Sequence, residues 1–269
     1  MNYKEYYEFP EGTVCGRKVY KAVDDINAFG VGELTGSWIY LMGNSNGMYA
    51  LPDIVGSPTA IEYGFYSCSY AVSLKGLENV DTSKCTNFTS LFNGFGSYIK
   101  TFMSTNIPLD TSPIKNWNTS NVTNMSSCFN GAKELVDFDV NWDTSKVTDM
   151  NTMFAGCTEL KRICPLRADS LAFSQYAGLF GSSTMNNLTE FGGLINLKSS
   201  WTGSNYALNK CPNLTYESCI NVLNGLYDFT GHGETPNSNQ GKLKVHQNFL
   251  DLVGDEITIG TNKGWTITV

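Results

Sequence analysis

Two neighbouring stretches of this chain carry nearly the same sequence, and that repetition constrains the fold more than any other feature. The stretch NTSNVTNMSSCFNGAKEL (118–135) is followed closely by DTSKVTDMNTMFAGCTEL (143–160). The two are identical or chemically similar at most positions. A fixed internal period is typical of units that fold alike and pack side by side.

The period is set by one aromatic or leucine residue in each unit, which we call the anchor. The anchors are Phe65, Phe92, Phe129, Phe154, Phe180 and Leu208. They recur every 25–28 residues, apart from one step of 37 residues that holds an insertion near 97–115. This period lies in the range of leucine-rich repeats.

Apolar residues precede the anchors at regular distances. Four residues before an anchor stand Met125 and Met150, and seven before stand Val122 and Val147. This spacing predicts one apolar stripe of a short helix. Aspartate or asparagine followed by Thr-Ser, at positions 81, 118 and 143, is predicted to cap that helix. Trp117 and Trp142, at the head of successive units, are predicted to join the anchors in one buried ladder.

A short strand is predicted after each anchor. The stretch LVDFDV (135–140) alternates apolar and polar residues, as a strand with one buried face does. We therefore expect an α/β solenoid, a leucine-rich-repeat-like stack of short strands and short helices. The expected divisions are a less regular N-terminal segment (1–45) for attachment or capping, the solenoid (46–214) and a C-terminal capping unit (215–269). In the last unit, strands are predicted at 242–245 and 265–269, with a helix between them.

Charge and hydropathy exclude several classes of protein. The formal net charge is −7 with a pI near 4.9, and no basic cluster is present, so a nucleic-acid binder is not expected. The densest apolar run, WIYLM (38–42), is far too short to insert into a membrane. The N-terminus lacks the apolar core of a secretory signal.

Few residues suggest catalysis. Asp137 and Asp139 alternate along one predicted strand and have a spacing that a glycosidase could use. The next unit places Lys161 and Arg162 at a comparable position, so we read these four residues as a mixed-charge binding face. His232 and His246 are expected to be structural. We expect no catalytic residue, cofactor or metal ion.

The cysteines are predicted to be free and buried. None of the eight has the spacing of a zinc or redox motif. Cys68, Cys157 and Cys211 each follow their anchor by three residues, a slot that Ala132 fills in another unit. A slot that accepts alanine or cysteine indicates a small buried side chain.

Outside the repeats, Tyr3, Tyr6 and Tyr7 are predicted to contact a partner, because tyrosine is common at interfaces.

The repeated stretches, each preceded by tryptophan, resemble the BspA-like leucine-rich repeats of bacterial surface proteins. The tail, from LTYESCINVLNGLYDFTG to GDEITIGTNKGWTITV, resembles C-terminal segments of phage and prophage virion proteins. Together these resemblances imply a non-enzymatic virion protein, associated with the tail, a fibre or the head. Its implied partners are other virion proteins, a second copy of itself, or a glycan or protein of the host surface. A cell-surface adhesin and, less favoured, a glycan hydrolase are the alternatives.

Overall fold

The computed structural model describes residues 56–71, 73–98, 107–172, 178–203 and 207–269, and the backbone of three strands nearer the N-terminus. Those three strands are β1 (Tyr3–Tyr7), β2 (Val19–Ala22) and β3 (Thr35–Ile39). β1 and β2 pair in antiparallel fashion, whereas β3 pairs in parallel with β4 (Ser57–Glu62).

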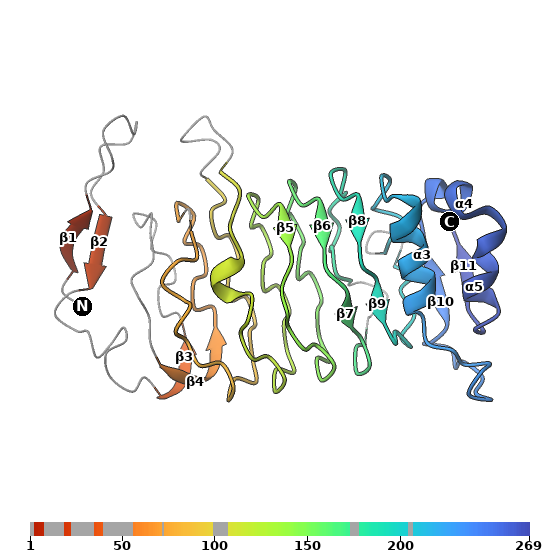
Figure 1. Cartoon of the computed structure of the whole chain (residues 1–269), viewed down its shortest axis with the longest axis horizontal. Helices are drawn as coiled ribbons and strands as arrows, with labels where there is room; N and C mark the ends of the chain where they lie inside the picture. The colour runs from red at the N-terminus through yellow and green to blue at the C-terminus, as the bar shows by residue number, and fades with distance from the viewer. Residues whose placement is uncertain are drawn as a thin grey trace.

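The other strands are two or three residues long. They are β5 (Asp137–Phe138), β6 (Arg162–Ile163), β7 (Leu166–Arg167), β8 (Glu190–Phe191), β9 (Leu194–Ile195), β10 (Lys242–Lys244) and β11 (Thr266–Thr268). All pair in parallel, in the separate small sheets β5-β6-β8, β7-β9 and β10-β11. Figure 1 shows these short strands on neighbouring passes of the chain along the long axis.

The longer helices gather near the C-terminus. They are α3 (Tyr216–Gly225), α4 (Gln247–Val253) and α5 (Thr258–Thr261), with a 3-10 turn η2 (Gly254–Ile257) between α4 and α5. Within the described part of the repeats there is one further 3-10 turn, η1 (Ser112–Ile114). In Figure 1 the three helices cover the end of the molecule that carries the C-terminus.

The predicted fold class, an α/β solenoid of the leucine-rich-repeat type, is wrong. Its short helices are absent from the described repeat units, and the strands lie in small separate sheets instead of one regular stack. The chain around the anchors Phe92, Phe129 and Phe154 forms consecutive turns. These turns, like a helix, bury apolar residues spaced by three and four positions. The spacing alone therefore could not distinguish a helix from consecutive turns.

Side-chain hydrogen bonds explain why turns form in place of helices. The carboxylate of Asp143 accepts a hydrogen bond from the backbone N–H of Ser145 at 2.9 Å, and the amide oxygen of Asn124 accepts one from Ser126 at 2.8 Å. Such bonds over two residues close a turn and compete with a helical path. Ser127 and Thr152, at equivalent positions, also have the left-handed φ values of 56° and 57°, which a helix does not contain.

The anchors form the centre of the core. The rings of consecutive anchors stack with centroid distances of 5.5 Å (Phe65–Phe92), 5.1 Å (Phe92–Phe129) and 6.1 Å (Phe129–Phe154). Phe180 lies against Trp201 at 5.8 Å, and Leu208 is buried. Stacked aromatic pairs stabilise a core beyond the area that they bury.

The other residues assigned to the ladder are also buried. Met125, Met150, Val122 and Val147 are fully enclosed. The indole rings of Trp117 and Trp142 lie parallel, 6.3 Å apart. Each indole N–H donates to a backbone carbonyl, that of Leu77 for Trp117 and that of Ile114 for Trp142, so the tryptophans add buried hydrogen bonds to their packing.

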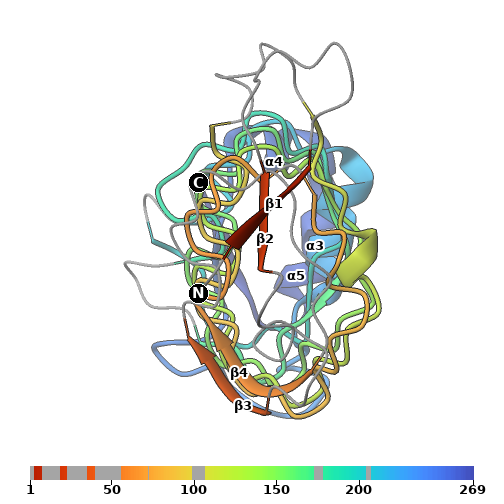
Figure 2. The same ribbon diagram turned by 90° about the vertical axis from the view of Figure 1, so that its left-hand side faces the viewer.

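Backbone hydrogen bonds connect equivalent positions of neighbouring units. The N–H of Phe88 donates to the carbonyl of Asn124, and that of Met125 to the carbonyl of Asp149, both at 2.8 Å. The buried hydroxyl of Thr119 donates to the carbonyl of Asp143 at 3.0 Å. Viewed along the long axis, the passes of the repeat units lie largely one behind another (Figure 2).

In three units glycine stands two residues after the anchor, whereas Ser67, with φ of 55°, takes this place in the Phe65 unit. Gly94, Gly131 and Gly156 all have φ of 73°, a region that other residues rarely adopt. A Cβ atom at Gly156 would also lie 3.4 Å from the Cα of Gly131. In these units the glycine of the Phe-x-Gly motif therefore allows both the turn conformation and the close approach of neighbouring units.

The C-terminal unit contains the predicted strands, as β10 and β11, with helix α4 between them. Helix α3, which the sequence did not predict, lies at the start of this unit. The ammonium group of Lys263 donates to the carbonyls of Leu223, Asn224 and Leu226 at 2.6–3.1 Å, and so caps the end of α3. The Asn-Lys-Gly-Trp motif of the tail thus ties the last strand to this helix.

The packing of the anchors predicts a large stability difference between two substitutions. Phe154 is 0 % exposed, so Phe154→Ala should lower the free energy of unfolding by about 3–5 kcal/mol, and Phe154→Asp by more. Lys146→Ala removes one exposed hydrogen bond to Asn121 and should change the free energy of unfolding by less than about 0.5 kcal/mol. Urea denaturation measures the stability of each variant. Equal denaturation midpoints for the Phe154 and Lys146 variants would contradict the burial of Phe154 in the core.

Candidate functional site

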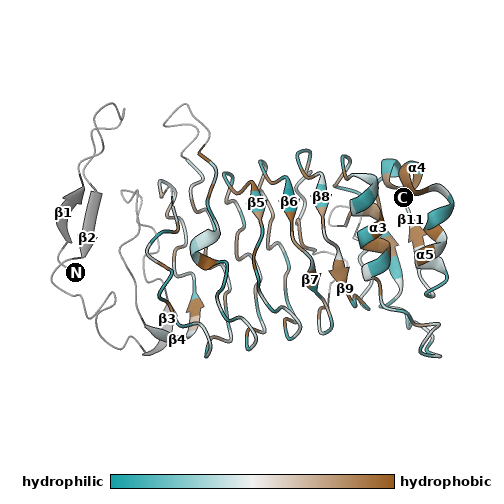
Figure 3. Ribbon diagram, in the orientation of Figure 1, coloured by the Kyte–Doolittle hydropathy of each residue, from teal (hydrophilic) through white to brown (hydrophobic). Residues whose placement is uncertain are grey.

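A group of charged side chains lies on the outer face of the β5-β6-β8 sheet. Phe138 and Ile163 point into the core, so their neighbours Asp137 and Arg162 point outward. The parallel register places Asp137 beside Arg162 and Arg162 beside Glu190. The outer face therefore alternates in charge from one strand to the next. In Figure 3, hydrophilic (teal) and hydrophobic (brown) residues follow one another along these short strands.

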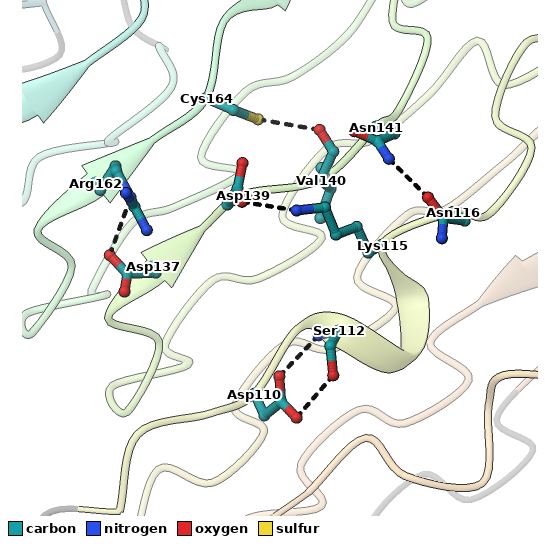
Figure 4. Close-up of polar contacts among 10 residues, drawn as sticks. All are labelled: Asp110, Ser112, Lys115, Asn116, Asp137, Asp139, Val140, Asn141, Arg162 and Cys164. Carbon is teal, nitrogen blue, oxygen red and sulfur yellow. Dashed lines mark hydrogen bonds and ion pairs between the residues drawn. The ribbon is translucent and has the colours of Figure 1, made fainter.

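Each aspartate of this face has a cationic partner. Nε of Arg162 lies 3.4 Å from Oδ1 of Asp137, and Nζ of Lys115 donates to Oδ2 of Asp139 at 2.8 Å (Figure 4). Lys115 directly follows η1, and no sequence pattern pointed to it, because it lies at the end of the insertion, outside the repeat register. All four side chains are substantially exposed.

This setting does not favour acid–base chemistry. The hydrogen bond from Lys115 holds the pKa of the Asp139 carboxyl below its ordinary value. A glycosidase needs one carboxyl whose pKa is raised, so that it stays protonated and can act as an acid. A carboxylate paired with a cation in water lacks that property.

Lys161, the fourth residue of the predicted binding face, helps to hold the sheet through its backbone. Its N–H donates to the carbonyl of Val136, and its carbonyl accepts hydrogen bonds from the N–H groups of Thr189 and Glu190. Its side chain is exposed on the same part of the surface as Arg162. The structure thus places Asp137, Asp139, Lys161 and Arg162 on adjoining strands or strand ends.

The predicted partner contacts of Tyr3, Tyr6 and Tyr7 lie outside what the structure describes. The three residues belong to β1, of which only the backbone is described.

The two histidines have structural contacts. Nδ1 of His232 lies 2.7 Å from the carbonyl oxygen of Asp228, and the ring stacks on Tyr227 at 4.8 Å. The side chain of His246 accepts a hydrogen bond from the N–H of Asn248 and so caps α4. Both imidazoles therefore order local chain segments.

All seven cysteines that the structure describes are free thiols, as predicted, and six are buried. Burial raises the pKa of Cys85 and of Cys219 to about 12, and raises the pKa of Cys128, Cys157 and Cys211 still further. The thiolate is the reactive form of cysteine. These side chains serve packing and are not nucleophiles.

Within the described ranges, no three histidine, cysteine, aspartate or glutamate side chains gather as metal ligands would. In the same part of the chain, no helix combines the length and the apolar character that crossing a bilayer requires.

A family described as "Mycoplasma protein of unknown function, DUF285" matches residues 59–162, less than half of the chain. The match covers the best repeated units together with Asp137, Asp139, Lys161 and Arg162. The family describes a domain that is linked to BspA-like surface proteins. No curated protein and no solved structure shows a significant match.

The buried thiols lead to a prediction about chemical labelling. Iodoacetamide at neutral pH should modify Cys157 in the native protein at least about 100-fold more slowly than in urea, because burial disfavours the thiolate and blocks access. Half-buried Cys164 is the internal control and should react before Cys157. Peptide mass spectrometry measures both rates; similar labelling of Cys157 in the two states would contradict its burial.

Proposed function

We propose that this chain is a non-enzymatic phage virion protein, associated with the tail, a fibre or the head, that displays a binding surface. The binding role is supported by the ordered mixed-charge face formed by Asp137, Arg162 and Glu190. Exposed charges held by short strands give a surface that loses little conformational entropy when a partner binds. Other virion proteins, a second copy of the chain, or a host surface glycan or protein would be the partners.

The observation that carries the virion setting is the state of the cysteines. Cys128 and Cys157 are both buried free thiols. Buried free thiols are typical of proteins that fold in a reducing compartment. Virions assemble in the host cytoplasm, which is such a compartment. The resemblance of the tail to segments of phage virion proteins supports the same setting.

A bacterial cell-surface protein is the second candidate. It is favoured by the match of residues 59–162 to a family linked to BspA-like surface proteins. In that setting the same mixed-charge face would serve adhesion. We do not propose a glycan hydrolase, because Asp137 and Asp139 are each paired with a cation.

Purified particles test the virion setting. Mass spectrometry of phage particles isolated from the host should detect the protein at a constant ratio to the capsid protein. A fraction of outer-surface proteins from cells without particles is the matched control and should lack it. Detection only in that surface fraction would favour the adhesin and contradict the virion proposal.

A further inference from the structure

A row of threonines outside the charged face is the surface feature that the proposed function leaves unexplained. Thr59, Thr86, Thr123 and Thr148 stand six residues before successive anchors, and all are exposed. The backbone N–H of each of the last three donates to the carbonyl of the threonine before it, at 2.8 Å. Neighbouring side chains in the row are therefore separated by about 4.8 Å, the spacing of hydrogen-bonded strands.

The threonine hydroxyls are held in fixed positions. Those of Thr86, Thr123 and Thr148 donate to the preceding threonine carbonyl at 3.1–3.2 Å. Because the proton of each hydroxyl is directed to the protein, the oxygen lone pairs remain as acceptors for a ligand. The row thus presents regularly spaced acceptors whose rotamers are already ordered, which reduces the entropy lost on binding.

A second row lies two residues earlier in each unit and provides donors. It consists of Lys84, Asn121 and Lys146, all exposed. Nζ of Lys146 donates to the amide oxygen of Asn121 at 3.0 Å, and the amide of Asn121 donates to the carbonyl of Ser83 at 2.8 Å. Lys84 and Lys146 therefore stand two units apart in the row with Asn121 between them, and the ammonium group of Lys146 leans toward that middle unit.

Carboxylates flank both rows, since Asp81 and Asp143 precede the lysines in the chain and the half-buried Asp149 directly follows Thr148. Asp81 and Asp143 each precede a lysine by three residues, and each accepts a backbone hydrogen bond within its own turn. These bonds hold the pKa of both carboxyls below the ordinary value. Asp149 likewise accepts a hydrogen bond, from the backbone N–H of Asn151 at 2.8 Å, so all three carboxylates are engaged within their own turns.

We propose that these two rows bind a linear polysaccharide in which an uncharged sugar alternates with a uronic acid. A pyranose ring is about as long as the spacing between strands, so a chain along the molecule could place one sugar on each unit. Its hydroxyls would donate to the threonine oxygens, and every second sugar would bring a carboxylate to Lys84 or Lys146. This inference deepens the proposed function and rests on the chain being a binding protein.

Calorimetric titration of the full chain tests the inference. The probe is an octasaccharide of alternating N-acetylglucosamine and glucuronic acid, and the comparison probe is a neutral octasaccharide of N-acetylglucosamine. We expect the charged probe to bind at least about tenfold more tightly at low salt, with the advantage falling as salt screens the lysines. Equal affinity for the two probes, or binding of neither, would overturn the inference.

Matched variants locate the site. The double substitution Lys84→Ala and Lys146→Ala should weaken binding of the charged probe by about tenfold or more, since charge-assisted hydrogen bonds are lost. The control, Lys75→Ala with Lys133→Ala, removes the same charge at exposed positions that belong to neither row and should leave affinity unchanged. Equal effects of the two pairs, in proteins with unchanged melting temperature, would refute the site.

A threonine variant tests the acceptor row separately. Thr123→Val retains the shape of the side chain but removes its oxygen, and should weaken binding severalfold if the protein still melts as the parent does. Unchanged affinity would show that the threonine hydroxyls do not contact the ligand. A protein that is present in particles but does not bind the probe would refute only this inference, whereas binding by a protein absent from particles would refute only the virion setting.

Discussion

The structure depends on hydrogen bonds between equivalent backbone positions of neighbouring units. Each described pass in the repeats is too short to satisfy its own N–H and carbonyl groups, and it pairs with the next pass instead, as Met125 does with Asp149. This pairing brings the anchors into contact, so that Phe92, Phe129 and Phe154 stack. Backbone pairing and aromatic burial therefore stabilise each other, and neither would persist in an isolated unit.

The same pairing arranges the surface. Because neighbouring units are in register, an outward residue in one unit lies beside the equivalent residue of the next. Asp137 and Arg162 lie side by side in this way on one face, and Thr123 and Thr148 do so on another. A surface built in this way has repeated chemistry at strand spacing, which suits a partner that is itself extended or repetitive.

The pKa shifts of Asp139 and of the buried cysteines both lead away from neutral pH. An enzyme places ionisable groups in environments that shift their pKa toward the pH at which they work. Here the pKa of Asp139 is lowered by Lys115, and the pKa of the buried cysteines is raised away from neutrality. The carboxyl of Asp139 and the buried thiol of Cys157 are thus each held in one charge state near neutral pH.

The sequence alone determined which residues are buried and how units are aligned, because large apolar side chains at a constant period, such as Phe129 and Phe154, must share one core. It also indicated that the cysteines are free. Only the tertiary structure decided that turns replace helices, since side-chain bonds such as that of Asn124 compete with a helical path. It alone paired Asp139 with Lys115, 24 residues away, because a local pattern carries no information about a partner that folding brings near.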